Sequence, residues 1–324
     1  MINFMPRLLH FICHSRYAMI AFVACGLLTA CGTGIEITER VTDKDVRRVV
    51  EKADARQPVV TIDAYADSLQ AWKPGKRFWV ADDQVKQLFA YQPGYDLDTL
   101  HLQGHVLRYV SHQTGGLFED DNRYIKIALN DSVTGITYIC NAGKATDAFR
   151  PGFSIPMLID MDMVDHIARQ VTGKDVFIRT PIWYDRDNGQ MKDGRHYIKV
   201  HIDSVLPGNA VLPLRTYFTA VDSGERAMVW MSNNASTMHG RDFDALFVAS
   251  DPHLAYPSIT DENWERITRG QVIEGMTKEE CRLALGAPKS IDERPEQTGM
   301  REFWYYDGGS YLYFVDGLLS HFRR

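Results

Sequence analysis

Apolar residues recur at helical spacing near both ends of the chain and alternate with polar residues in between. Within 42–58, Val46, Val49 and Val50 lie three or four positions apart, the spacing of one face of an amphipathic helix. From 59 to 232 the pattern changes to short alternating runs separated by Gly, Asp and Asn, which is typical of strands and turns. The pattern therefore predicts an N-terminal helix followed by a long β-rich region.

The β-rich region contains two similar stretches. Residues 74–82, PGKRFWVAD, resemble residues 172–180, TGKDVFIRT, because each places Gly-Lys before an aromatic and β-branched run. Two further pairs of similar segments are 100–116 with 195–209, and 124–140 with 214–232. With about four or five short strands per unit, the pattern predicts two small barrels that resemble bacterial SH3-like domains. A helix over 162–174 joins them, and its apolar face comprises Met163, Val164, Ile167, Ala168 and Val171.

The C-terminal region carries explicit helix and turn signals. In GMTKEECRLALGAP (275–288), Thr277 and Glu280 form a capping box at a helix start, while Gly286 and Pro288 end the helix. Another helix is predicted over 258–270. Three alternating strands follow over 300–307, 310–317 and 318–322, separated by Asp-Gly turns. The predicted order of this module is αα-βββ.

These patterns together predict an α+β protein, with two small SH3-like β-units followed by the αα-βββ domain. The predicted parts are a signal peptide over 1–30, a tether and helix over 31–58, a first β-unit over 59–160, a linking helix with a second β-unit over 161–232, a linker over 233–257 and the C-terminal domain over 258–324.

The first thirty residues read as a targeting segment. Arg7 and Arg16 precede an apolar run over 18–28, which is shorter than the roughly 20 apolar residues that span a bilayer. The run ends in Leu28-Thr29-Ala30-Cys31, which resembles a bacterial lipobox. The resemblance implies cleavage before Cys31 and attachment of fatty acids such as palmitate to that residue. We therefore expect a lipid-anchored protein of the outer membrane, since position 32 is Gly and not the Asp of an inner-membrane retention signal; an ordinary signal peptide or membrane anchor is the alternative.

Charge and cysteine content limit the partners. The formal net charge is −6, and residues 1–30 hold two Arg and no acid, so the mature chain is more negative still. Nucleic acid is not expected as a partner, because binding phosphates needs a basic face. After removal of the signal peptide and lipidation of Cys31, Cys140 and Cys281 remain; a disulfide is permitted in the envelope, but two buried free thiols fit better because the residues fall in different units.

The C-terminal region resembles the SmpA/OmlA family, also called BamE-like. The shared features are Gly275-Met276-Thr277, Cys281, Leu285-Gly286 with Pro288, Trp304 with Tyr306, and Phe314 with Gly317. Members are small outer-membrane lipoproteins, and the type member is an accessory subunit of the β-barrel assembly machine. The similarity covers about sixty residues, 264–322, and implies a BamE-like domain. Here that domain would end a long chain instead of directly following the lipid anchor.

Few residue patterns suggest chemistry. Sequence motifs for serine hydrolases, zinc proteases, dithiol redox sites and P-loops do not occur. His101 and His105 lie in a predicted strand, the acids of 160–166 suit a helix cap, and 185–194 departs from a calcium loop in its Gly and Glu positions. We therefore expect no catalytic residue, metal or cofactor.

Aromatic residues on predicted strands are the remaining candidates for a binding surface. They are Trp183, Trp304, Tyr306, Tyr311 and Tyr313. Outward-facing rings can stack on sugars or grip a peptide, whereas inward-facing rings would only fill the core. The predicted function is a non-enzymatic scaffold that docks an envelope protein, with outer-membrane protein assembly as one context. The alternative is a module that binds cell-wall glycan or peptide through the β-units.

Overall fold

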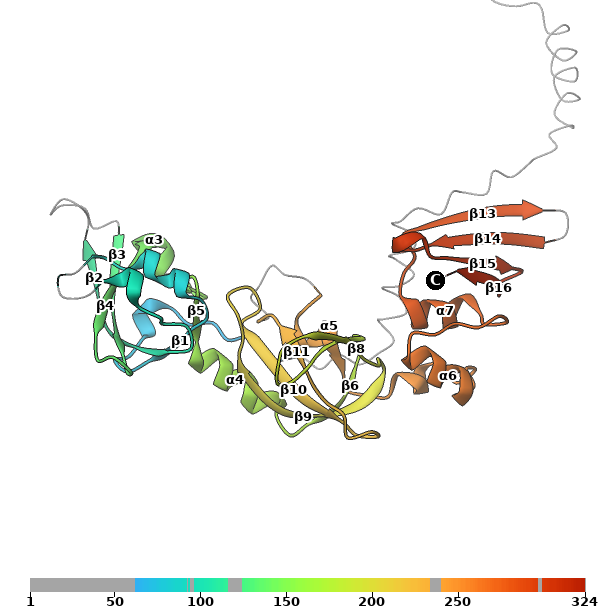
Figure 1. The fold of residues 1–324 in the computed structure, drawn as a ribbon, viewed down its shortest axis with the longest axis horizontal. Helices are drawn as coiled ribbons and strands as arrows, with labels where there is room; N and C mark the ends of the chain where they lie inside the picture. The colour runs from blue at the N-terminus through green and yellow to red at the C-terminus, as the bar shows by residue number, and fades with distance from the viewer. Residues whose placement is uncertain are drawn as a thin grey trace, which may run out of the picture. The chain divides into compact units, whose positions relative to one another are not determined.

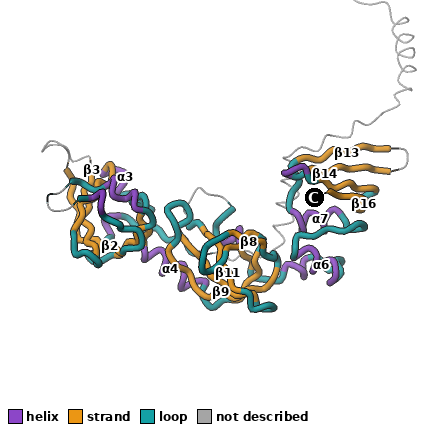
Figure 2. Tube along the Cα trace, in the orientation of Figure 1, coloured by secondary structure: helices purple, strands orange, loops and turns teal. Residues whose placement is uncertain are grey.

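The structure is a computed structural model that describes residues 62–91, 93, 96–115, 124–233, 240–296 and 299–323. In this part of the chain, three antiparallel sheets follow one another, with short helices between them (Figure 1; Figure 2). Of the described residues, strands account for 39% and helices for 22%. The fold is mostly β, so the predicted α+β class is wrong. The helix predicted over 42–58 lies outside the described residues.

The first sheet has five strands in the order β4-β3-β2-β1-β5. Its hairpins follow turn chemistry: the Asp131 carboxylate accepts hydrogen bonds from the Val133 amide (3.0 Å) and the Thr134 hydroxyl (2.7 Å) in the turn between β3 and β4. One face of the sheet carries a buried core that includes Leu107, Ile127 and other apolar side chains. The strands are β1 (Arg77–Val80), β2 (Val106–Gly115), β3 (Tyr124–Asp131), β4 (Thr137–Lys144) and β5 (Leu158–Asp160).

The second sheet has seven strands in the order β12-β6-β9-β10-β11-β7-β8. It is larger than the predicted four- or five-stranded unit, and part of the predicted 233–257 linker belongs to it through α5 (Phe243–Leu246) and β12 (Phe247–Val248). The other strands are β6 (Asp175–Ile178), β7 (Ile182–Tyr184), β8 (Met191–Asp193), β9 (Ile198–Pro207), β10 (Leu214–Ala220) and β11 (Arg226–Met231).

The two sheets repeat one five-stranded arrangement. The order β4-β3-β2-β1-β5 corresponds to β11-β10-β9-β6-β12, and a short helix precedes the last strand in each: α3 (Ala145–Ala148) before β5 and α5 before β12. Both also carry a bulge on the long second strand, at Val110 in β2 and at Asp203 in β9. The second copy differs by the added β7–β8 hairpin. Sequence similarity between the copies therefore reflects a repeated topology.

A buried lysine joins β1 to the start of α4 (Met161–Val171). The Lys76 ammonium, whose side chain is 4% exposed, lies 3.2 Å from Asp67, 2.8 Å from Asp160 and 2.8 Å from Asp162. Burial alone would disfavour the charged amine, but hydrogen bonds to Asp160, Asp162 and Tyr65 outweigh it and raise the pKa of Lys76. Asp160 also caps α4 by accepting from the Asp162 amide, so these carboxylates serve the fold.

The C-terminal part combines two helices with a four-stranded meander. The capping box predicted for α7 is present: Thr277 accepts from the Glu280 amide, and Glu280 accepts from the Thr277 amide. Strand β13, rich in charge, was not predicted, so the αα-βββ order and the predicted fold of this domain are wrong. The elements are α6 (Asp261–Thr268), α7 (Lys278–Leu285), β13 (Ser290–Glu296), β14 (Gly299–Tyr305), β15 (Tyr311–Val315) and β16 (Leu318–Arg323).

Five 3₁₀ turns complete the described elements. The Asp82 and Asp96 side chains cap the second and third of them, as short polar residues do at helix starts. Their bounds are η1 (Leu69–Ala71), η2 (Asp83–Leu88), η3 (Leu97–Thr99), η4 (Pro252–Ala255) and η5 (Asp307–Gly309).

Candidate functional site

The outer side of the C-terminal sheet gathers aromatic rings from two strands. Strands β14 and β15 pair with Phe303 opposite Tyr313 and Tyr305 opposite Tyr311. Because side chains alternate between the two sides of a strand, residues directly opposite each other share a side. These four rings therefore lie on one side of the sheet, which we call the aromatic face.

Three of the four rings of the aromatic face are in ring contact, with Phe303 between Tyr305 and Tyr313. The Phe303 and Tyr313 centroids are 4.5 Å apart, the Phe303 and Tyr305 centroids 6.4 Å apart, and His321 on β16 lies 6.4 Å from Tyr313. These spacings fall in the range in which aromatic pairs attract. Tyr305 remains 40% exposed, so the stacked rings form a surface and not a core.

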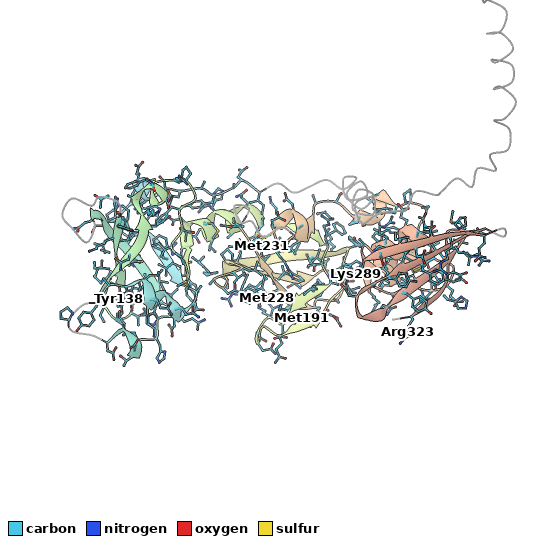
Figure 3. The ribbon with its side chains drawn as sticks, turned by 90° about the horizontal axis from the view of Figure 1, so that it is seen from above. Tyr138, Met191, Met228, Met231, Lys289 and Arg323 are labelled. Carbon is cyan, nitrogen blue, oxygen red and sulfur yellow. The ribbon has the colours of Figure 1, made fainter. Side chains whose placement is uncertain are left out.

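Arginine side chains are interleaved with the rings. The Arg294 guanidinium lies 5.5 Å from the Phe303 centroid, and Arg301 donates to the Tyr313 hydroxyl at 3.0 Å. Arg323, labelled in Figure 3, pairs across from Tyr311 at the end of β16. Asp292 partly neutralises Arg294 at 2.7 Å. Tyrosine and arginine are the residue types enriched in the energetic centres of protein interfaces.

The opposite side of the same sheet forms the domain core. Trp304, Leu312, Phe314 and Leu319 are at most 2% exposed and cluster with Met276 and Cys281 from the helical side. Trp304, 1% exposed, also lies under the Arg282 guanidinium at 4.9 Å and donates to Glu302 at 3.2 Å. The Trp304 side chain therefore holds the sheet to the helices and is unavailable to a partner.

Two other predicted surface residues also serve the fold. Tyr306 donates to the Gly286 carbonyl at 3.3 Å, and burial raises the pKa of its hydroxyl. Trp183 is fully buried in the second sheet, 5.1 Å from Phe218. Of the five predicted residues, only Tyr311 and Tyr313 lie on the aromatic face.

Sequence reasoning missed Phe303 and Tyr305. In EFWYYD (302–307) aromatic residues fall on both sides of the strand, so alternation alone does not say which side is buried. The register decides it, because Tyr311 lies opposite Tyr305 while Trp304 lies opposite Leu312. The sequence does contain a signal, because Leu312 and Phe314 form an entirely apolar side of the next strand. Pairing that side with Trp304 places Trp304 in the core.

A pocket of about 400 Å³ lies beside β5 and is also lined by Ala210, Val211, Pro213 and Asn233. Tyr65, Asp67 and Asp160 supply polar groups to its lining. All three interact with the Lys76 ammonium, so those groups are engaged by the protein itself. We therefore do not place the functional site there.

Several predictions concern residues or chemistry beyond this surface. The lipobox residues Leu28, Thr29, Ala30 and Cys31 lie outside the described residues. Within the described ranges, no group of three or more His, Cys, Asp or Glu residues could hold a metal ion. No helix in those ranges is long and apolar enough to cross a membrane. Comparisons with protein-family models, curated proteins and solved structures give no match.

Proposed function

We propose that this protein is a lipid-anchored, non-enzymatic scaffold of the bacterial outer membrane that docks an envelope protein on its aromatic face. The observation that carries the proposal is the set of four rings, three of them in contact, with interleaved arginines on the side of the sheet opposite the domain core. Rings in contact lose little conformational freedom on binding. They therefore suit a protein partner.

The anchor part of the proposal rests on Leu28-Thr29-Ala30-Cys31. Two or more acyl chains give stable membrane attachment, whereas one gives only marginal binding. We expect Cys31→Ala to release the protein into the soluble fraction of lysed cells, measured by fractionation and immunoblotting. Cys25→Ala, within the predicted signal segment, is the matched control and should remain with the membranes. Membrane retention of the Cys31→Ala protein would contradict lipid anchoring.

The partner part is tested by site-specific photocrosslinking in cells. A photoreactive phenylalanine derivative replaces Tyr305 on the aromatic face, and in a second strain replaces Val133, which is 68% exposed on the first sheet. We expect a discrete crosslinked envelope protein from position 305 only. Adding Tyr313→Ser, which removes another ring of the aromatic face, should abolish that product.

The C-terminal motif resemblance to BamE-like lipoproteins suggests which partner to expect. If mass spectrometry identifies the crosslinked protein as the central subunit of the barrel-assembly machine, outer-membrane protein assembly is supported. Identification of another envelope protein would retain the scaffold but reject that context. An identical product pattern from positions 305 and 133 would reject docking on the aromatic face.

Glycan binding is the second candidate, because Phe303 and Tyr305 are almost parallel, with 14° between their ring planes. Such flat rings on the outer side of a sheet can stack on sugar rings. Co-sedimentation with purified cell-wall sacculi measures this directly. Binding that is lost in Phe303→Ser would favour the glycan over a protein partner, and absence of sedimentation would remove this candidate.

A further inference from the structure

The second sheet also presents rings and arginines on its outer side. Register pairs place Leu206, Arg215 and Trp230 in one row across β9, β10 and β11. The next row holds Ser204, Tyr217 and Met228, and continues to Tyr184 on β7 and Met191 on β8. Tyr217 (7% exposed) and Met228 (2% exposed) are buried, so the first row and Met191 make up most of the accessible part of the face. We call these two rows the Arg215 face. Met191 and Met228, on its β7–β8 side, are labelled in Figure 3.

Aromatic rings hold Arg215 in place. Its guanidinium carbon lies 5.9 Å from the Tyr217 centroid and 5.9 Å from the Trp230 centroid, and its Nε donates to the Pro207 carbonyl at 2.7 Å. Tyr184 packs edge-on against Trp230 at 6.2 Å. A guanidinium positioned by ring contacts and one backbone bond keeps its two terminal nitrogens as donors.

The charge of Arg215 is not neutralised within the described part of the chain, where no carboxylate forms an ion pair with it. Arg186, the second arginine near Tyr217, lies 5.3 Å from the centroid of that ring. Arg186 forms an ion pair with Asp203 at 3.4 Å. Asp203 also accepts from the Thr219 hydroxyl at 2.9 Å. The Arg215 face is therefore locally cationic in a chain of net charge −6.

The first sheet shows that the fold does not need this face. Counting from the shared bulge, the row Leu206, Arg215 and Trp230 corresponds to Gln113, Lys126 and Asn141 in the first copy. Tyr217 in the next row corresponds to Ala128. The first copy thus has polar or small side chains where the second has rings. Because the same topology forms without these rings in the first copy, we infer that they serve binding in the second copy.

We propose that the Arg215 face binds an extended acidic peptide segment of a partner protein. The Arg215 donors match a carboxylate in bidentate geometry, and the partner's apolar side chains would lie on Trp230, Leu206 (43% exposed) and Met191 (69% exposed). This apolar surround favours a peptide over a free inorganic anion. The site lies on a different sheet from the aromatic face and is a second docking surface.

The test uses the full-length chain labelled with 5-fluorotryptophan, with the Trp230 fluorine resonance assigned through Trp230→Phe. The probe is a peptide of about eight residues, alternating glutamate and leucine, roughly 26 Å when extended. We expect saturable movement of the Trp230 resonance. Arg215→Gln should weaken binding roughly tenfold, because a hydrogen bond to a charged group is lost.

Matched controls come from the duplication. Lys126→Gln changes the corresponding cation of the first sheet and should leave the affinity within about twofold, the scatter expected of a surface substitution. If Arg215→Gln fails to fold, as judged by its urea midpoint, Arg186→Gln replaces it, with weaker binding again expected. Replacing the peptide's glutamates by glutamine should abolish binding.

Three outcomes would overturn the proposal. One is no movement of the Trp230 resonance up to about 1 mM peptide, the weak end of specific affinities. Another is equal binding of the glutamate and glutamine peptides. The third is a response to phosphatidylglycerol vesicles without a response to the peptide, which would assign the face to lipid phosphates.

Discussion

At the scale of single residues, the side of the strand decides what an aromatic residue does. Trp304 and Tyr305 are neighbours in sequence, yet the first is 1% exposed and the second 40%. Trp183, another ring with a surface role in the sequence-based prediction, is buried completely. Composition indicated that these strands were rich in rings, but only register assigned each ring to a side.

Gly194 shows how tightly Trp183 is enclosed. A Cβ at position 194 would fall well inside contact distance of the Trp183 ring carbons. We expect Gly194→Ala to destabilise the protein by about 1–3 kcal/mol, because overpacking a buried ring forces it off its preferred rotamer. Urea unfolding measures the change. Gly115→Ala, where a Cβ meets nothing within 4 Å, should leave the midpoint unchanged; a similar loss in both variants would contradict this packing explanation.

At the scale of elements, helix α7 could be predicted from the sequence, whereas strand β13 could not. The capping box of α7 is written in residues close together in the chain, so Thr277 and Glu280 could be identified without tertiary information. Strand β13 could not, because Asp292, Glu293 and Pro295 have low strand propensity. It forms because it is an edge strand, where charge and a missing amide donor are tolerated.

The segment that leads into β9 contains a buried histidine with a pH-dependent role. Burial lowers the pKa of His196 to about 4, against a smaller opposing effect of backbone groups at Leu283 and Ile267. The unfolded chain takes up this proton near pH 6.5, so the unfolded state binds more protons between about pH 6.5 and 4. Stability from His196 is therefore full above pH 6.5 and is lost as the pH falls toward 4.

We expect His196 to lower the free energy of unfolding by about 2 kcal/mol when the pH falls from about 7.5 to about 5. His196→Gln, which cannot titrate, should show a smaller drop in urea midpoint over the same interval. His101→Gln, at a side chain 90% exposed, should behave like the parent protein. Equal drops in the parent and in His196→Gln would show that another group is responsible.

At the scale of the whole molecule, the two buried cysteines can be used to follow the unfolding of two different sheets. Cys140 on β4 and Cys281 on α7 are free and buried, as predicted, and burial raises the pKa of each thiol to about 12. Glu280 adds to the effect at Cys281. Both thiols therefore stay protonated at neutral pH and lack the reactive thiolate form.

We expect neither thiol to react with iodoacetamide at about pH 8, far below their pKa, until urea unfolds the surrounding sheet. Peptide mass spectrometry separates the two sites, so the order of labelling along a urea series gives the order in which the two regions unfold. Labelling of Cys140 in the native protein would contradict its burial beneath the first sheet.

Local sequence was sufficient to predict the α7 cap, most strand positions and the internal repeat, and it carries the lipobox pattern on which the proposed anchor rests. These depend on residues close together in the chain or on direct similarity between segments. Tertiary structure decided the mostly β class, the four-stranded meander, the added hairpin of the second sheet and the identity of the exposed rings. Those features depend on strand register, and shifting a strand by one residue exchanges its buried and exposed sides. Pairing between distant segments sets that register, so Phe303 and Tyr305 emerged as surface residues only once β14 was placed against β15.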